Sequence, residues 1–526
     1  MSDSLMSVKN LRISFHDKRE TVAVQNFNLE IKPGEIVGLV GESGSGKSQS
    51  ALAMAGLLNR HSMEKSGEVL FHGKNLMTCS RSELRQFQGN KISIIFQEPM
   101  TSLNPVKKIG WQVEESLRIH FKDLTTDQQK ERAIKLLGDV GIVNPKGVYS
   151  MYPNELSGGM RQRVMIAAAM ISDPEILIAD EPTTALDVSI QAQIIDLLKE
   201  INKKKNTSII FISHDLSLVR QICTRVLVMQ KGEVVEEGES KEIFEHPRKE
   251  YTKQLIDAIP TIDGLRADND STSDYALEIK NVNAYYKTRI GKLMKKENRQ
   301  ILFDISMNIK KGEVLGLVGE SGCGKTSLAR IITGINKQYE GSVSLSDPYP
   351  QMVFQDPYSS LNPSKTIRQI LEEPLIVDRR RKWNRGQRLE RIEEVIKEIE
   401  IDRELLERHP SELSGGQRQR VSIGAAIMCA PGLLIADEAV SALDVTIQSQ
   451  ILALLERLNK EFGIAILFIS HDMRVVYKIC DNVCIMNGGR IIEYGDIDEV
   501  YGTPKEDYTK TLMKASGIVD DLQHEN

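Results

Sequence analysis

Two glycine-rich stretches carry the residue types of a phosphate-binding loop. Each fits the pattern G-x-x-x-x-G-K-[ST] and follows a short apolar run, which is typical of a buried strand that ends at a nucleotide site. The glycines let successive backbone N–H groups surround phosphates, while the lysine reaches the terminal phosphates and the final hydroxyl can ligate Mg²⁺. We expect each loop and the residue that follows it to contact nucleotide. These residues are Gly41, Glu42, Ser43, Gly44, Ser45, Gly46, Lys47, Ser48 and Gln49, and Gly319, Glu320, Ser321, Gly322, Cys323, Gly324, Lys325, Thr326 and Ser327.

The chain contains one long internal repeat. Leu-Ser-Gly-Gly at 156–159, Ala-Asp-Glu at 179–181 and Ser-His-Asp at 213–215 all return 257 residues later. The phosphate loops lie 278 residues apart, so the second copy lacks about twenty residues between its loop and the glutamine that follows. The missing segment corresponds to Glu68–Gln88, whose alternating pattern predicts a peripheral hairpin.

A pair of carboxylates ends an apolar run in each copy. Asp180 and Glu181 follow one run, and Asp437 and Glu438 follow the other. Open parallel sheets present ligand-facing residues at the carboxyl ends of their strands. We therefore expect Asp180 and Asp437 to hold Mg²⁺, directly or through water, and Glu181 and Glu438 to align or deprotonate the water that attacks in phosphoryl transfer. The alternative is a solvated acidic turn.

A glutamine and a histidine follow other apolar runs of each copy. Gln97 comes after Ile94–Phe96 and could sense Mg²⁺ or water, and Gln355 is its second copy. His214 follows another predicted strand, and His471 lies at the repeat offset from it. A single loop glutamine or a single histidine after a strand is usually structural. Because both recur, we take all four as catalytic candidates, and the glutamines also as metal ligands.

A second glycine motif marks another anion site. Leu156–Gly159 precedes Arg161–Met170, whose pattern predicts a helix, and bare backbone N–H groups at a helix start attract anions. This motif cannot serve the phosphates of Lys47 if it lies across a helical subdomain, so it must face the phosphate of another site. The motif residues that we expect to contact nucleotide are Ser157, Gly158, Gly159, Ser414, Gly415, Gly416 and Gln417.

Short apolar runs alternate with helical periods in each half, which predicts an α/β, doubly wound fold. Ile176–Ala179 and Ser208–Ile212 are expected to be parallel central strands and Ile190–Ile201 a helix. The polar, helical pattern from Leu103 to Pro153 predicts an inserted helical subdomain.

Two polar segments lie outside these patterns. Pro260–Tyr275, between the halves, is acidic and has no period, so we expect a flexible tether. Lys287–Lys296 is an insertion in the second half, and it predicts a solvated basic loop, with a membrane-surface contact as the alternative.

The composition limits the classes of partner. The chain has 526 residues and a net charge of -5, so no global charge draws it to nucleic acid or anionic lipid. No apolar run approaches the roughly 18 residues that span a bilayer, and Met1–Ser4 lacks the layout of a signal peptide, so we expect a cytoplasmic protein. Of the six cysteines only Cys480 and Cys484 lie close together, and we expect buried thiols rather than metal ligands.

As an ordered set in two copies, these motifs resemble the ATP-binding cassette superfamily over nearly the whole chain. The resemblance implies two tandem P-loop cassettes at residues 1–259 and 277–526, joined by a linker at 260–276. Each cassette is expected to have a RecA-like core, an inserted helical subdomain and a small β subdomain. ATP and Mg²⁺ are the implied cofactors.

The same resemblance implies head-to-tail pairing of the two cassettes within one chain. The motif of Ser157 would then complete the site of Lys325, and that of Ser414 would complete the site of Lys47. Phe15 and Tyr286 match the aromatic residue that stacks on adenine in this superfamily, although either could equally be a core residue.

Finer features resemble the ATPases of oligopeptide, dipeptide and nickel importers. They are Gln97–Pro105 and Gln355–Pro363, the motif Ala-Leu-Asp-Val-x-Ile-Gln at 185–191 and 442–448, and the C-terminal elements His246–Thr252 and Thr503–Thr509. The size and tandem layout most resemble the fused ATPase of Yej-type peptide and microcin importers.

This branch implies an ATPase that energises import of peptides or peptide-like solutes. The implied partners are two membrane permease subunits and an extracytoplasmic solute-binding protein, with no nucleic acid, and the implied location is the cytoplasmic face of the membrane. The main alternative is a soluble tandem-cassette ATPase that acts at the ribosome, a class whose halves are joined by a long charged helix.

Departures from the superfamily pattern predict differences between the two sites. Cys323 replaces Ser45, and because a helix dipole tends to lower the pKa of a thiol, we expect a reactive thiol that bound ATP protects. Met160 stands where the usual motif has Gln, and Ala439-Val440 replaces the equivalent Pro-Thr. All of these departures fall in the implied site of Lys325, so we expect it to turn over more slowly.

Overall fold

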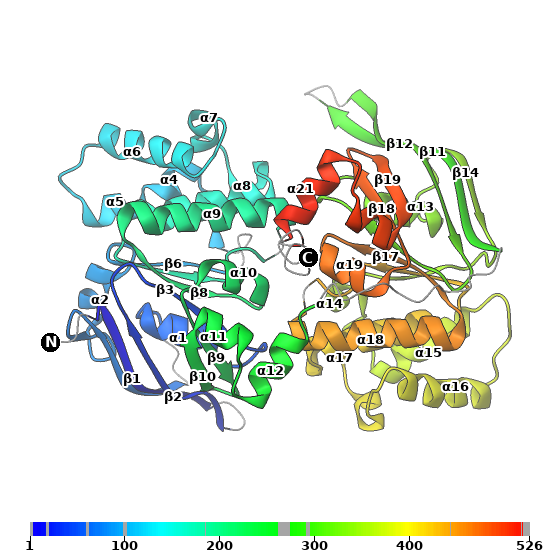
Figure 1. The fold of residues 1–526 in the computed structure, drawn as a ribbon, viewed down its shortest axis with the longest axis horizontal. Coiled ribbons are helices and arrows are strands. Elements are labelled where there is room, and N and C mark those ends of the chain that lie inside the picture. Colours follow the sequence, from blue (N-terminus) through cyan, green and yellow to red (C-terminus); the bar gives the residue numbers. More distant parts are fainter. Residues whose placement is uncertain are drawn as a thin grey trace. The chain divides into compact units, whose positions relative to one another are not determined.

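The computed structural model describes residues 4–16, 20–58, 63–97, 102–184, 186–260, 274–290, 295–441, 443–516 and 518. This part of the chain forms two compact units, the first essentially up to Ile259 and the second from Pro260 onward (Figure 1). The residues expected to form the tether lie mostly outside the described ranges. None of the helices in these ranges combines the length and the apolar character needed to cross a membrane.

The helices and strands of the first unit are β1 (Met6–His16), β2 (Glu20–Ile31), β3 (Ile36–Val40), α1 (Lys47–Met54), β4 (Met63–Phe71), β5 (Lys74–Asn75), α2 (Arg81–Phe87), β6 (Ile92–Ile95), α4 (Ile109–Val113), α5 (Glu115–His120), α6 (Thr126–Asp139), α7 (Pro145–Tyr149), η1 (Pro153–Glu155), α8 (Gly158–Met170), β7 (Ile176–Asp180), α9 (Val188–Lys205), β8 (Ser208–Ile212), α10 (Leu216–Ile222), β9 (Arg225–Gln230), β10 (Glu233–Glu239), α11 (Ser240–Glu245) and α12 (Glu250–Asp257).

Those of the second unit are β11 (Tyr275–Ile290), β12 (Lys295–Lys310), β13 (Val314–Val318), α13 (Lys325–Ile332), β14 (Tyr339–Leu345), β15 (Gln351–Val353), α14 (Pro357–Ser360), α15 (Ile367–Val377), α16 (Arg385–Glu398), η2 (Arg403–Glu407), η3 (Pro410–Glu412), α17 (Gly415–Ile427), β16 (Leu433–Asp437), α18 (Val445–Phe462), β17 (Ala465–Ser470), α19 (Met473–Ile479), β18 (Asn482–Asn487), β19 (Arg490–Asp496), α20 (Ile497–Gly502) and α21 (Asp507–Ala515).

A six-stranded sheet forms the centre of each unit. In the first unit its order is β10-β9-β3-β8-β7-β6, and in the second β15-β16-β17-β13-β18-β19. All neighbouring strands run parallel except the last hairpin, β9–β10 or β18–β19. Every residue of β3, β7 and β8 is buried, as expected for strands that are covered on both faces. The predicted α/β doubly wound fold is therefore confirmed.

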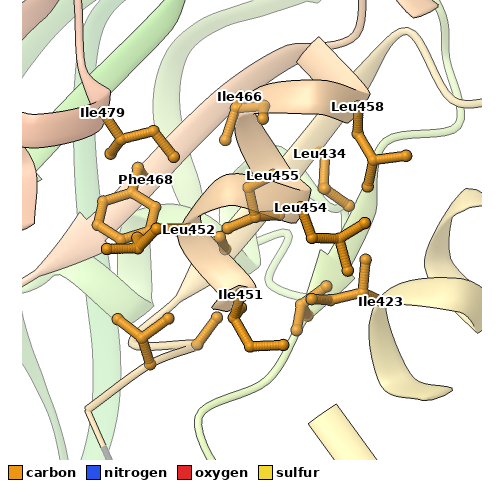
Figure 2. Packing of buried hydrophobic residues seen from close by; sticks show 14 of the residues in the cluster. Ile423, Leu434, Ile451, Leu452, Leu454, Leu455, Leu458, Ile466, Phe468 and Ile479 are labelled. Atoms are coloured by element: carbon orange, nitrogen blue, oxygen red, sulfur yellow. The ribbon is translucent and has the colours of Figure 1, made fainter. Parts of the chain in front are cut away.

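Helix α18 shows how the sheet is covered in the second unit. Leu452 and Leu455 on this helix lie beside Phe468 of β17 and Leu434 of β16, and all four are at most 2% exposed (Figure 2). The apolar residues recur every three or four positions along the helix, so a single stripe faces the sheet. Burial of such side chains stabilises the fold by roughly 1.5–3 kcal/mol each.

The predicted helical subdomain is present in the first unit. Helices α4 to α7 fill the segment between β6 and α8, and they stand together as one group (Figure 1). Ile109, Val113 and Leu137 are fully buried and pack in the same cluster as Val164 and Ile166 of α8. The subdomain is thus fixed to the helix that carries the second glycine motif.

The small sheets correct two sequence predictions. The hairpin expected to be missing from the second copy is only partly missing, because β14 pairs with β11 as β4 pairs with β1, and the elements without a counterpart there are β5 and α2. The basic loop prediction is also wrong in its described residues. Lys287–Ile290 pairs with Lys295–Asn298 as the end of an antiparallel hairpin, because the β11–β12 ladder continues into the insertion.

Candidate functional site

The first phosphate loop joins the buried strand β3 to helix α1, and its geometry admits only glycine at two positions. Gly41 has φ 146° and Gly46 has φ 100°. A Cβ atom at Gly41 would lie 2.1 Å from the carbonyl oxygen of Met229, and one at Gly46 would lie 2.3 Å from that of Ala23. The loop is therefore pressed against the surrounding backbone. Its tip, Ser43-Gly44, is exposed.

The loop lysine is held by the loop itself. Lys47 Nζ donates to the carbonyl oxygens of Gly41 at 2.6 Å and Glu42 at 2.8 Å, and Lys325 Nζ makes the equivalent bonds to Gly319 at 2.6 Å and Glu320 at 3.0 Å. Burial lowers the pKa of the Lys47 ammonium, against the opposing charges of Glu181 and Asp180. The two carboxylates predicted from the sequence therefore act electrostatically on this ammonium.

Asp180, the last residue of β7, lies beside the final hydroxyl of the loop. Ser48 Oγ donates to Asp180 Oδ1 at 3.2 Å, and Thr326 Oγ1 donates to Asp437 Oδ1 at 3.4 Å. Burial, aided by the charge of Glu181, raises the pKa of Asp180 to about 6. A hydroxyl and a carboxylate are oxygen ligands of the kind that Mg²⁺ prefers, with the remaining positions filled by water and phosphate.

This oxygen pair does not form a cage for a metal ion by itself. Among the residues that the structure describes, no group of three or more His, Cys, Asp or Glu side chains is arranged to hold a metal. A partial site of this kind fits an ion that arrives with phosphate groups.

Three side chains from three different segments contact the Glu181 carboxylate. Gln97 Nε2 donates to Glu181 Oε2 at 2.7 Å, Thr184 Oγ1 donates to the same oxygen at 2.9 Å, and His214 Nδ1 lies 3.3 Å from it. Burial alone would raise the pKa of Glu181, but the hydrogen bond and charge of His214, with the bonds from Thr184 and Gln97, lower it to about 2. Burial alone would lower the pKa of the half-buried His214, but its hydrogen bond with Glu181 and the charge of that carboxylate raise it.

The backbone of both glutamates is strained. Glu181 has φ 49° and Glu438 has φ 48°, in the left-handed region that non-glycine residues rarely adopt. The N–H of Glu181 donates to the Ile212 carbonyl at 2.9 Å, and that of Glu438 donates to the Ile469 carbonyl at 2.9 Å. The adjacent strand end thus holds each glutamate in place, and such strain is most often found at functional sites.

The second unit repeats this arrangement with one difference. Gln355 Nε2 donates to Glu438 Oε2 at 2.6 Å, whereas His471 Nδ1 lies 3.7 Å from Oε1. Ser441, the counterpart of Thr184, donates to the main-chain carbonyl of Glu438 at 3.0 Å and has only a minor influence on its carboxylate. The contacts on Glu438 are therefore spread over both oxygens, and the histidine lies farther from the carboxylate than in the first unit.

Sheet topology explains why these residues meet. The phosphate loop follows β3, His214 follows β8, Glu181 follows β7 and Gln97 follows β6, and these four strands are parallel neighbours. Their carboxyl ends lie at one edge of the sheet, which is where open α/β sheets bind ligands. The structure thus brings together every candidate that the sequence placed after these strands.

The second glycine motif starts α8 and α17. Ser157 is the N-cap of α8 and accepts the Met160 N–H at 3.3 Å. Ser414 caps α17 in the same way, and there Gln417 Oε1 also accepts the Ser414 N–H at 3.0 Å. The glutamine therefore closes a reciprocal capping box that Met160 cannot form.

The remaining candidates lie where the sequence placed them, but their roles stay predictions. Gln49 and Ser327 are in the first turns of α1 and α13. Phe15 on β1 is half-buried against the core, and Tyr286 on β11 is also half-buried, so both the stacking and the core alternatives remain for these two residues.

The lowered pKa expected for Cys323 is wrong, whereas protection of the thiol by bound ATP stays a prediction. Cys323 is only 7% exposed, and burial raises the pKa of its thiol, although the charge of Lys325 opposes the shift. Desolvation of the thiolate outweighs the helix dipole on which the expectation relied. Cys480 and Cys484 are fully buried, as predicted for structural thiols.

Sequence reasoning did not assign a site contact to Thr184, Tyr251 or Tyr508. Thr184 holds Glu181, and the two tyrosines accept hydrogen bonds from the phosphate loops. The constant repeat offset could have drawn attention to the tyrosines, because 251 and 508 differ by the same 257 residues as the motifs.

Comparisons with known proteins cover nearly the whole chain. The family described as "ABC transporter" matches residues 24–184 and 302–441, and the "Oligopeptide/dipeptide transporter, C-terminal region" matches residues 235–280. A relative from Agrobacterium fabrum, "Peptidoglycan transport ATP-binding protein YejF", is 39% identical over 99% of this chain and 97% of its own length. One from Escherichia coli, "Uncharacterized ABC transporter ATP-binding protein YejF", is 40% identical over 98% of this chain and 100% of its own length. "Glutathione import ATP-binding protein GsiA" from Salmonella paratyphi A is 38% identical over 99% of this chain and 91% of its own length.

Among solved structures, the complex of archaeal ribosomal stalk protein aP1 with the ribosome recycling factor aABCE1 contains a chain of similar fold. The TM-score is 0.62 with 19% sequence identity, and the match covers 93% of this chain and 90% of the other. At this identity the likeness concerns the fold alone.

Proposed function

Because this chain belongs to the ABC transporter family, and is an importer ATPase that works with membrane permeases, we propose that it hydrolyses Mg²⁺-ATP to drive uptake of peptides or peptide-like solutes. The names of its relatives support this solute class, since glutathione is a tripeptide and peptidoglycan contains peptides. The match to the oligopeptide/dipeptide transporter C-terminal region supports it as well.

The proposal includes the assembly. Two permease subunits and an extracytoplasmic solute-binding protein are the proposed partners, and the cytoplasmic face of the membrane is the proposed location. We assign the cassettes to residues 1–259 and 277–526, with a linker at 260–276, and propose that they pair head to tail within one chain. Phe15 and Tyr286 would stack on adenine, and Ser157, Gly158, Gly159, Ser414, Gly415, Gly416 and Gln417 would contact nucleotide across that pairing.

The observation that carries the catalytic proposal is the set of side chains around Glu181. Gln97, Thr184 and His214 all contact Oε2, so we assign Oε1 to the attacking water. Glu181 would orient this water for in-line attack on the terminal phosphate, which Lys47 and the loop N–H groups hold. Glu438, with Gln355 and His471, would do the same in the second cassette.

Ser48 and Asp180 in one cassette, and Thr326 and Asp437 in the other, would hold Mg²⁺. Gln97 and Gln355, which bind the adjacent Glu181 and Glu438, would sense the ion or the water. The ion would neutralise charge on the phosphates. The ribosome-associated alternative has only the fold-level likeness to the recycling factor in its favour, whereas relatives matched over nearly their full length carry transporter names.

The test is the double variant Glu181→Gln/Glu438→Gln. Gln keeps the shape of the side chain but cannot orient or activate water as a carboxylate does, so turnover should fall about a hundredfold or more while ATP binding is retained. Phosphate release and nucleotide binding by the purified chain would be measured side by side. Near-normal turnover would refute the assignment of the two glutamates as the residues that act on water. Loss of ATP binding would refute the claim that they are not needed to bind the phosphates.

A further inference from the structure

In both units a tyrosine from the C-terminal element contacts the phosphate loop. Tyr251 Oη accepts a hydrogen bond from the Glu42 N–H at 3.2 Å, and Tyr508 Oη accepts one from the Glu320 N–H at 3.1 Å. The two tyrosines occupy the same position of the internal repeat, and so do Glu42 and Glu320 in their loops. The same bond between segments about 200 residues apart in sequence therefore forms twice, in two separate units.

The tyrosine and the loop lysine hold the same loop residue from two sides. Lys47 binds the carbonyl oxygen of Glu42, and Tyr251 binds its N–H. Lys325 and Tyr508 hold Glu320 in the same way. Lys47 Nζ also donates to Ser45 Oγ at 3.3 Å, so all three donors of its ammonium are engaged, and turning toward a phosphate must release at least one of these bonds. The tyrosine bond does not depend on the lysine and can persist.

The element that carries each tyrosine is firmly attached to its own unit. The Glu236 carboxylate of β10 accepts the N–H groups of Arg248 at 2.8 Å and Lys249 at 3.1 Å, just before α12. Charge-assisted bonds of this kind at a helix start are among the stronger hydrogen bonds in proteins. The tyrosine that follows them is thus placed by the sheet.

The second unit repeats this attachment. The Glu493 carboxylate of β19 accepts the N–H groups of Lys505 at 2.8 Å and Glu506 at 3.3 Å, and the hydroxyl of the fully buried Thr509 donates to it as well. Leu512, 3% exposed, anchors the other side of α21 in the core. The rings of Tyr251 and Tyr508 also pack against the cores of their units.

We propose that Tyr251 and Tyr508 are positioning residues, which fix the Glu42 and Glu320 peptides and so couple nucleotide affinity to the docking of the C-terminal element. The inference rests on the proposed function in that the loops must bind ATP. It gives the C-terminal region a role inside the cassette that carries it. The competing explanation is that the element only packs against the core and that its contact with the loop has no effect on nucleotide.

The test compares Tyr251→Phe, Tyr508→Phe and the double variant with Tyr494→Phe in the full chain. Tyr494 is the matched control, because its hydroxyl contacts the Asn308 side chain at 3.3 Å rather than a phosphate loop. Two quantities are measured. One is the ATP dissociation constant in the Glu181→Gln/Glu438→Gln background, and the other is amide hydrogen exchange of the peptides that contain Glu42 and Glu320, without nucleotide.

The loss of one hydrogen bond should raise the dissociation constant about three- to tenfold and speed exchange of the affected loop by a similar factor. The maximal rate at saturating ATP, in the chain with both glutamates intact, should change less than twofold. Tyr494→Phe should match the parent chain in all three readouts. Unchanged affinity and unchanged loop exchange in the double variant would overturn the proposal, even if thermal stability fell. Failure of the parent chain itself to bind ATP would instead refute the proposed function, and loop exchange would still decide whether the tyrosines position the loops.

Discussion

At the scale of single residues, the two glutamates differ in how they are held. Glu181 has three contacts on one oxygen, whereas the contacts on Glu438 are divided between its oxygens and the nearby hydroxyl turns to the backbone. A hydrogen bond to a charged group contributes more to its orientation than one between neutral groups. Thr184 and its counterpart Ser441 differ by one methyl group. The carboxylates beside them differ in how firmly they are oriented, with Glu181 held more firmly than Glu438.

Thr184→Val tests this difference directly. The variant keeps the shape of the side chain but removes the bond to Glu181 Oε2, so turnover should fall roughly three- to tenfold with ATP affinity unchanged. Ser441→Ala is the matched variant of the second unit, and it should cost less than twofold because its hydroxyl bonds the main chain. Steady-state ATPase rates decide the matter, and equal losses would contradict the assigned role of Thr184.

Cys323 provides a second prediction at this scale. Because burial raises its pKa, the thiolate fraction at pH 7 lies below that of an ordinary thiol and grows only as the pH rises toward the higher pKa. Maleimide should therefore label Cys323 more slowly than the partly exposed Cys79 at pH 7, with a rate that increases toward pH 9. Peptide mapping of the labelled chain would show this order, and preferential labelling of Cys323 at pH 7 would contradict it.

At the scale of elements, the starts of α8 and α17 differ by one residue. Both helices have a serine N-cap, but only α17 has a glutamine that returns a hydrogen bond to the cap. Each unsatisfied N–H in a first turn weakens that turn, and a complete capping box is worth about 1 kcal/mol. The first turn of α8 should therefore open more readily than that of α17.

Met160→Gln should complete the box at α8. Amide exchange of the first turn of α8 should slow about two- to fivefold, since the added bond stabilises the closed turn. Gln417→Met is the reciprocal variant, and it should speed exchange at α17 by a similar factor. If Met160→Gln left exchange of the first turn unchanged, the glutamine would not act as a cap in this context.

At the scale of the whole molecule, one fold unit occurs twice and its departures are not evenly distributed. Cys323, Ala439 and Val440 all lie in the second copy, and the implied pairing adds Met160 to the same composite site. The contacts on Glu438 point in the same direction, because they orient the carboxylate less firmly. Both glutamates are present, so neither site should be inactive.

We therefore expect Glu181→Gln to impair turnover several-fold more than Glu438→Gln, with Met160→Gln narrowing the gap. The physical reason is that, in the proposed pairing, Met160 would remove about one hydrogen bond from the site of Lys325, worth on the order of 1 kcal/mol. The comparison requires saturating ATP and the permease partners, so that transport-coupled turnover is measured. Equal losses in the two single variants would reject the asymmetry.

Much of this protein was determined by local sequence. The phosphate loops need glycine because the backbone adopts positive φ there, and the buried strands need continuous apolar runs because both faces of the sheet are covered. The constant repeat offset then located Asp180, Glu181 and His214 with their second copies, and Gln97 and Gln355 follow equivalent apolar runs. All of these residues lie at the ends of strands that a parallel sheet must align.

Tertiary structure decided what depends on neighbours distant in sequence. Whether Thr184 bonds a carboxylate, or Tyr251 reaches the loop of Glu42, depends on side chains that meet only after the sheet has formed. The thiol of Cys323 shows the same limit, because the helix dipole acts through adjacent residues, whereas the desolvation that outweighs it comes from the packed core around the loop. Local pattern sets backbone conformation and which runs become buried strands, while strand order, burial and long-range hydrogen bonds appear only when the units are packed.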